Sequence, residues 1–282
     1  MAAITASMVK ELREMTGAGM MDCKKALVEV EGDVEKAVDW LRQKGMSKAA
    51  KKSGRATSEG LVCVVRNDQA VAMSAVLCET DFVARGDQFV ALADKVANTV
   101  LAQAPADADA LQGLVGEDLT QLIASVGENM TLGQFVRVPL TEGVLVGQYI
   151  HSNNKIGVLV SVACGDAATA AKPEVAELAK NVAMQVAATN PLALNESSLD
   201  QAAVEREREV YRQKALEEGK PAQIVEKIAE GAVKKFYKEV CLLDQPYIRD
   251  DKQTIADVVR AAGKACGADL SVTGFTRIQL GA

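Results

Sequence analysis

Apolar side chains in the first 45 residues recur at the spacing of helical faces and predict three short helices. The apolar face of the first helix consists of Ile4, Met8, Leu12 and Met15. A second helix begins near Asp22, and a third runs from its N-cap Asp33 to Lys44, where Gly45 ends it. Residues 1–46 are therefore expected to form a three-helix N-terminal domain with a thin core.

The next stretch, residues 47–58, is small, polar and basic, and has no clean apolar stripe. This composition predicts a linker between folded parts. Its positive side chains are Lys48, Lys51, Lys52 and Arg55. We expect them to be solvated along a tether, and the alternative is a binding patch.

Beyond the linker the chain repeats itself. Two strand-like runs surround Asn67-Asp68, and two more surround Asn153-Asn154. Each pair leads into a helix, and the run Leu92–Ala97 of the first lines up with Leu178–Ala183 of the second. The repeat predicts two ββα units, each with a helix on a small antiparallel sheet. The expected core subdomains span residues 59–140 and 141–282.

Three further segments complete the predicted α+β fold. A helix ends at Gly127, a strand follows at Met130–Val138, and "SVTGFTRIQLGA" predicts a closing edge strand. Residues 197–240 have a charged helical pattern that is broken once, at Gly219-Lys220-Pro221, which predicts an antiparallel helical hairpin inserted in the second subdomain. Few of its residues are apolar. We therefore expect it to protrude as an arm for a partner or a second copy of the chain, and the alternative is packing flat on the body.

Composition narrows the function. The chain has 282 residues and a net charge of −6, which argues against a nucleic-acid binder that relies on a global positive field. None of the six cysteines are two or three residues apart, so no metal knuckle or redox pair is indicated, and we expect small apolar residues in a reducing cytosol. With no apolar run typical of a signal peptide or a membrane span, we expect a cytoplasmic protein.

Catalytic chemistry finds little support. His151 is the single histidine, and nothing around Cys164 resembles a nucleophile that it could activate. The glycines at Gly17–Gly19 follow no strand and lack the lysine of a phosphate-binding loop. We therefore expect a binding protein with no enzyme activity, metal or cofactor.

One corner stands out, within "CETDFVARGDQF". Asp81 and Phe82 lie where a strand-like run gives way to a helix, a place that usually holds small polar residues. Aligning the two repeats sets them against Ala167 and Ala168, so the corner itself does not need an aromatic. Phe82 is thus a candidate for a role outside its own fold, and the alternative is a ring folded back onto its domain.

The motifs "TASMVKELREMTGAGMMDCKKAL" and "TDFVA" resemble the bacterial elongation factor Ts family, guanine nucleotide exchange factors for elongation factor Tu. The resemblance covers almost the whole chain, in the order head, linker, duplicated core and coiled-coil insertion. It implies a head like a ubiquitin-associated (UBA) bundle and binding to elongation factor Tu, both GDP-bound and nucleotide-free. It also implies no membrane or direct nucleic-acid partner, and leaves a homodimer through the hairpin open.

The resemblance also implies the residues of the site. Asp81 and Phe82 would disturb the magnesium and phosphate site of the partner, with Thr80 and Val83 shaping the tip; residues 80–83 are here called the exchange wedge. The other implied partner contacts are Met20, Met21, Lys24, Val126, Gly127 and His151. Two departures from the family are Glu79, a second carboxylate near Asp81, and the lack, natural or by truncation, of the helical module that many members have after the last strand.

Two other functions stay open from the residues alone. An adaptor would bind its partners through the three-helix head and would not need the exchange wedge. An RNA-binding translation protein would use the patch from Lys48 to Arg55, with steep salt dependence. The acidic balance and the lack of stacking aromatics near the patch disfavour the RNA binder.

Overall fold

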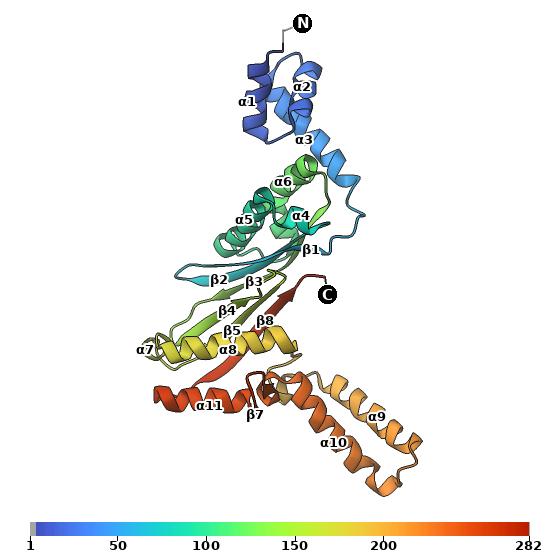
Figure 1. Ribbon diagram of the computed structural model, residues 1–282, viewed down its shortest axis with the longest axis vertical. Coiled ribbons are helices and arrows are strands. Elements are labelled where there is room, and N and C mark those ends of the chain that lie inside the picture. Colours follow the sequence, from blue (N-terminus) through green and yellow to red (C-terminus); the bar gives the residue numbers. More distant parts are fainter. Residues whose placement is uncertain (1–3, 282) are drawn as a thin grey trace. The chain divides into compact units, whose positions relative to one another are not determined.

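The computed structural model describes residues 4–281 and shows a mixed helix and sheet protein, which confirms the α+β class (Figure 1). Two compact units make up the chain. The first runs to Val138 and also includes Ser152–Ile156 and a C-terminal piece from Ile278. The second comprises Pro139–His151 and Gly157–Arg277. Within the described residues, no helix has the length and apolar character to cross a membrane.

The head of the first unit consists of three helices: α1 (Ala6–Thr16), α2 (Met20–Glu29) and α3 (Val34–Ala50). Thr5 and Asp33 cap α1 and α3, because their side chains accept the N–H groups of Met8 and Lys36. The side chains that fill the core are few, as expected for so short a bundle. Those fully buried are Leu12, Cys23, Ala26, Leu27 and Ala37.

The predicted end of the third helix at Gly45 is wrong. Helix α3 continues to Ala50, into the stretch expected to be a linker. Gly45 lies against α6 (Ala108–Val126), where an added Cβ would meet the Cβ of Ala124 at 3.5 Å. Packing against a helix far along the sequence therefore overrides the usual tendency of glycine to end a helix.

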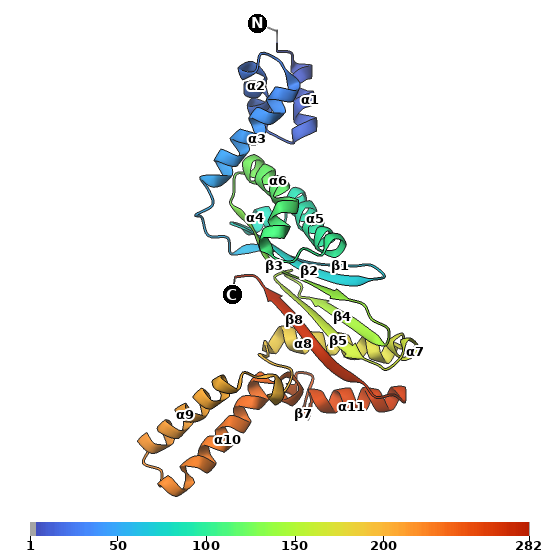
Figure 2. The same ribbon diagram turned by 180° about the vertical axis from the view of Figure 1, so that it is seen from behind.

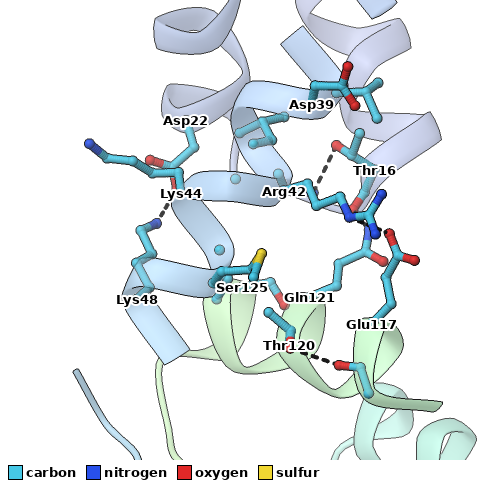
Figure 3. Close-up of a pocket in the computed structure, with 18 of the residues that line it drawn as sticks. Thr16, Asp22, Asp39, Arg42, Lys44, Lys48, Glu117, Thr120, Gln121 and Ser125 are labelled. Atoms are coloured by element: carbon cyan, nitrogen blue, oxygen red, sulfur yellow. Dashed lines mark hydrogen bonds and ion pairs between the residues drawn. The ribbon is translucent and has the colours of Figure 1, made fainter. Parts of the chain in front are cut away.

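A pocket of about 640 Å³ lies between the head and α6 (Figure 3). Across it, Arg42 and Glu117 form an ion pair of 3.1 Å, and the side chain of Gln121 donates to the carbonyl of Thr16. On the head side, Lys48 pairs with Asp22 at 2.8 Å. The Arg42–Glu117 pair and the Gln121 hydrogen bond thus join the head to α6, whereas Lys48 and Asp22 pair within the head.

The sheet of the first unit has the strand order β1 (Glu59–Arg66), β2 (Ala70–Cys78), β3 (Met130–Pro139). Strands β1 and β2 are antiparallel and pair Glu59 with Cys78, as the predicted turn at Asn67-Asp68 requires. Helix α5 (Asp87–Gln103) packs on these two strands. The shared core includes Phe89, Val96, Val100, Leu111 and Val115.

The second unit repeats this succession. Its sheet has the order β4 (Val144–Ile150), β5 (Ile156–Ala163), β8 (Ser271–Gln279), and β4 and β5 are antiparallel. In the first unit, β2 is followed by the four-residue helix α4 (Asp81–Ala84) and the 17-residue helix α5. In the second unit, β5 is followed in the same way by the four-residue α7 (Ala167–Ala170) and the 17-residue α8 (Pro173–Thr189). In each unit a further helix, α6 or α11 (Ile255–Cys266), precedes the third strand. The predicted repeat is confirmed and extends beyond ββα.

Extra elements interrupt the second repeat between α8 and α11. They are the short helices η1 (Glu196–Ser198) and η2 (Leu242–Asp244), the long helices α9 (Gln201–Glu217) and α10 (Ala222–Val240), and the strands β6 (Pro246–Tyr247) and β7 (Asp250–Thr254). Helices α9 and α10 lie side by side in both views (Figures 1 and 2). Gly219, at φ +71°, makes the turn between them.

A buried polar network fixes the root of α10. Gln185 of α8 is fully buried; its side chain donates to Gln245 at 3.1 Å and accepts the N–H of Ile248 at 2.9 Å. Gln245 in turn donates to the carbonyl of Glu239 at 2.7 Å. Because each of these buried groups has a partner, the network holds the end of α10 firmly on α8.

Candidate functional site

The corner between β2 and α5, residues 79–85, carries the exchange wedge. Here the chain forms the single helical turn α4 (Asp81–Ala84). Thr80 is its N-cap, in an extended conformation, and its hydroxyl oxygen accepts the N–H of Val83 at 3.4 Å. So short a helix has little stability of its own and depends on its cap and its packing.

Phe82 points away from the fold. Its side chain is 86% exposed, whereas Phe89, seven residues later, is 1% exposed in the core. Val83 and Ala84 anchor the corner, because both pack on the core cluster of the first unit. Successive residues of a helix differ by about 100° in direction, so anchoring these two leaves Phe82 facing solvent.

The second unit makes the same corner without an aromatic. Asp166 caps α7 as Thr80 caps α4, and it accepts the N–H of Thr169 at 2.8 Å. Ala167 and Ala168 stand at the positions of Asp81 and Phe82. The backbone path therefore does not require the ring or the acid, as the aligned repeats predict.

Asp81 forms an ion pair within the corner. Its carboxylate pairs with Arg85, one helical turn later, at 2.9 Å. The two side chains are 48% and 80% exposed, so water screens the pair and it adds little to stability. The carboxylate thus remains accessible beside the exposed ring.

Glu79 does not serve as a second acid beside Asp81. Its Oε1 accepts hydrogen bonds from the backbone N–H of Asn129 at 2.5 Å and from Nη1 of Arg55 at 3.3 Å. The Asn129 N–H, with Arg55 adding to the effect, holds the pKa of the Glu79 carboxyl below its usual range. Glu79 therefore connects the corner to the loop between α6 and β3.

That loop supplies two residues that sequence reasoning missed. Glu128 accepts the N–H of Thr80 at 3.0 Å and its hydroxyl at 2.7 Å. The buried side chain of Asn129 donates to the carbonyl of Arg55 at 2.8 Å. The signal was a polar pair directly after the helix-ending Gly127, next to the implied contacts Val126 and Gly127.

Val126 and Gly127, which open this turn, are engaged within the unit. Val126 packs on the core, and Gly127 ends α6 at φ +91°, with its N–H bonded to Ile123 at 3.0 Å. The Gly127 carbonyl accepts the ammonium group of Lys52. Val126 and Gly127 therefore fix the start of the loop between α6 and β3, and this loop supports the α4 corner.

The basic stretch from Lys48 to Arg55, which begins in the last turn of α3, uses much of its charge inside the chain. Lys48 pairs with Asp22, Lys52 binds the Gly127 carbonyl, and Arg55 pairs with Glu79. Thr57 also bonds Thr131 at 3.0 Å. These contacts tie the segment to the first unit and weaken the RNA-binding alternative.

The three candidate residues of the head share one exposed part of α2. Met21 is 76% exposed, Met20 is about half exposed, and Lys24 follows one turn later. Exposed methionines suit contact surfaces, because their side chains are flexible and polarizable. The head thus offers an apolar surface with a positive charge beside it.

His151 belongs to the second unit and is exposed. Its Nδ1 lies 3.1 Å from the hydroxyl of Tyr149. Cys164, the other member of the disfavoured dyad, is buried and its thiol donates to the carbonyl of Val162 at 3.3 Å. Burial raises the pKa of this thiol, which makes it a poor nucleophile. In residues 4–281 no cluster of His, Cys, Asp or Glu side chains is arranged to hold a metal ion.

Comparison with known proteins gives the family. The model of the family described as Elongation factor TS matches residues 79–282, a span that begins at the α4 corner. The chain belongs to the elongation factor Ts family. Elongation factor Ts of Desulfovibrio desulfuricans is 75% identical over the full length of both chains.

Other relatives agree along nearly the whole chain. Elongation factor Ts of Nitratidesulfovibrio vulgaris is 58% identical over 99% of this chain and 96% of the relative. That of Lawsonia intracellularis is 53% identical over 99% of each. Membership of this family makes the chain a translation elongation factor of the nucleotide exchange class, and elongation factor Tu is the partner that the family implies.

Proposed function

We propose that this chain binds elongation factor Tu with GDP and speeds GDP release, after which GTP binds again. In this mechanism Asp81 and Phe82 disturb the magnesium and phosphate site of the partner. The observation that carries the proposal is the 86% exposure of Phe82, on a turn whose neighbours are anchored in the core. A free aromatic ring on a firm base is suited to insertion into another protein.

The physical target is the grip on the nucleotide. GTPases hold GDP mainly through its phosphates and a magnesium ion, which requires near-ideal octahedral coordination by oxygen. A ring that displaces a supporting loop or helix spoils this coordination without touching the nucleotide. The reaction makes and breaks no covalent bond and needs no cofactor on this chain.

Energetics require more than the ring. Burying one phenylalanine contributes about 1.5–3 kcal/mol, whereas a thousandfold loss of GDP affinity needs about 4 kcal/mol. Further contacts must supply the difference, and we assign them to Met20, Met21, Lys24, Val126, Gly127 and His151. The exposure of Met20, Met21 and Lys24 fits this role directly. Val126 and Gly127 would act from the loop that supports the corner.

Asp81 adds an electrostatic contribution. A carboxylate brought near the phosphates repels them and competes for the donors that held them. Its pair with Arg85 is exposed, so exchanging Arg85 for a group of the partner costs little. Linkage makes the antagonism mutual: the factor that weakens GDP binding is itself bound less tightly when GDP is present.

The helical hairpin is a second proposed contact surface. Apolar side chains of α9 and α10 are exposed, and Val210 is the most exposed of them at 58%. Such side chains favour contact with another helical surface, either on the partner or on a second copy of the chain. Sedimentation of the wild-type chain and of Val210→Glu distinguishes these: a mass that falls in the variant indicates a homodimer through the hairpin.

The wedge is tested by the rate of GDP release. Stopped-flow release of a fluorescent GDP analogue from elongation factor Tu is measured for wild type and Phe82→Ala, beside a titration of complex formation. We expect Phe82→Ala to slow release more than it weakens the complex. Leu192→Ala, which truncates another exposed apolar side chain, is the matched control and should behave as wild type. Unchanged release by Phe82→Ala would overturn the proposal.

A further inference from the structure

The α4 corner and the loop after α6 are joined by two acids, one from each segment. Glu128 of the loop accepts the N–H of Thr80, and Glu79 of the corner accepts the N–H of Asn129. Each acid therefore binds the backbone next to the other. Glu128 contributes most to the cap, since it also takes the hydroxyl hydrogen of Thr80 at 2.7 Å.

This second bond decides how the cap works. A hydroxyl has one hydrogen and two lone pairs, and Glu128 takes the hydrogen. A lone pair of the Thr80 hydroxyl then points to the N–H of Val83, and this hydrogen bond caps the start of α4. Without Glu128 the hydroxyl hydrogen is free to rotate, so the cap bond loses its fixed direction and the short helix relies more on the packing of Val83 and Ala84.

The corresponding corner of the second unit needs no such help. Asp166 uses one oxygen for the N–H of Thr169 and the other for its hydroxyl, at 2.8 and 2.9 Å. That corner is satisfied by residues three apart, whereas the α4 corner depends on an acid 48 residues away. The distant acid occurs at the corner that carries the exposed ring.

We propose that Glu128 is the positioning residue of the exchange wedge, setting the direction of Phe82 by taking both polar hydrogens of Thr80. This inference rests on the proposed function for its effect on GDP release. Its effect on the corner itself does not depend on that function. The two can therefore be tested separately.

The first readout is hydrogen exchange of the free chain. In Glu128→Ala, we expect the amides of residues 80–85 to exchange on the order of tenfold faster, the factor for about 1.4 kcal/mol. Glu128→Gln keeps one acceptor and should lie between Ala and wild type. Asp166→Ala, the matched control, should loosen residues 167–171 and leave residues 80–85 unchanged. Unchanged exchange at residues 80–85 in Glu128→Ala would overturn the inference.

The second readout is GDP release at saturating factor. Glu128→Ala should slow release on the order of tenfold, with a smaller change in the concentration for half-saturation. With Asp166→Ala, elongation factor Tu should release GDP at the rate seen with the wild-type chain. Equal slowing by both variants would mean general loosening, and would reject a positioning role for Glu128.

The double variant Phe82→Ala/Glu128→Ala separates the inference from the proposed function. If Glu128 acts through the ring, the double variant is no slower than Phe82→Ala alone. Additive losses would overturn the inference while leaving the wedge intact. If elongation factor Tu releases GDP equally fast with Phe82→Ala and with wild type, the proposed function fails. The hydrogen-exchange result then still decides whether Glu128 orders the corner.

Discussion

Thr80 and Asp166 occupy the same position in the two units. Each caps a four-residue helix, and each accepts the N–H of the residue three positions later, at 3.4 and 2.8 Å. The next two residues differ: Asp81 and Phe82 in one unit, two alanines in the other. Duplication has thus kept the scaffold of the corner and placed the exposed chemistry on a single copy.

Replacing Thr80 tests the cap. Thr80→Ala removes the acceptor for Val83 and one donor to Glu128, and we expect it to lower the free energy of unfolding by about 1 kcal/mol. Thr80→Ser keeps the hydroxyl and should restore most of the loss. Urea unfolding of the three chains measures this. Equal stability of Thr80→Ala and wild type would show that the cap bond does not contribute to the free energy of unfolding.

The pH dependence of Glu79 follows from its partners. Because Asn129 and Arg55 lower the pKa of the folded carboxyl, its stabilisation is fully present above the ordinary glutamate pKa near 4.3 and is lost as the pH falls through the folded value. Glu79→Gln should therefore be less stable than wild type at pH 7, and the difference should narrow below about pH 4. Urea midpoints at several pH values measure it.

An exposed glutamate of α8, Glu177→Gln, serves as the control for this series. It should change the urea midpoint less at pH 7 than Glu79→Gln does. A gap between Glu79→Gln and wild type that stays constant from pH 7 to pH 3 would contradict the role assigned to the carboxylate.

The sequence predicts elements wherever the pattern is local. The strands around Asn67 and Asn154 and the helices α5 and α8 follow from apolar periodicity and turn residues close by in the chain. The exposure of Phe82 was also within reach, because the repeat supplied Ala168 as an internal comparison. A residue unnecessary to its own corner is free to act elsewhere.

Long-range partners could not be predicted in the same way. Gly45 remains helical because α3 packs on Ala124, and Glu79 turns away from Asp81 because Asn129 offers an amide 50 residues later. Nothing near Gly45 or Glu79 in the sequence indicates these partners. The support of the site was therefore missed, although its exposed tip was found.

Gly45 offers a test of the packing between α3 and α6. An alanine Cβ would meet Ala124 at 3.5 Å, an ordinary contact, so Gly45→Ala should stabilise the helix by up to about 1 kcal/mol. Gly45→Leu exceeds the space and should destabilise the head. Gly17→Ala is the matched control, because its φ of +67° disfavours any side chain, and it should lose stability. A loss of stability in Gly45→Ala would contradict this packing.

Arg212 joins the two helices of the hairpin through a fork. Its Nε and Nη2 donate to the two oxygens of Glu226 at 2.6 and 3.0 Å, and its Nη1 contacts Glu209. Lysine carries the same charge but cannot make paired parallel bonds, so Arg212→Lys should loosen α9 from α10. The expected result is faster hydrogen exchange across residues 205–230, with the head and first sheet unchanged.

The matched control for Arg212→Lys is Arg206→Lys, since Arg206 pairs with Asp200 within one arm and only at 3.8 Å. A single long contact does not use the fork, so lysine replaces it without loss and hydrogen exchange should stay at the wild-type rate. If neither variant loosens the hairpin, charge alone holds α9 to α10. If only Arg212→Lys does, the geometry of the fork holds α9 to α10.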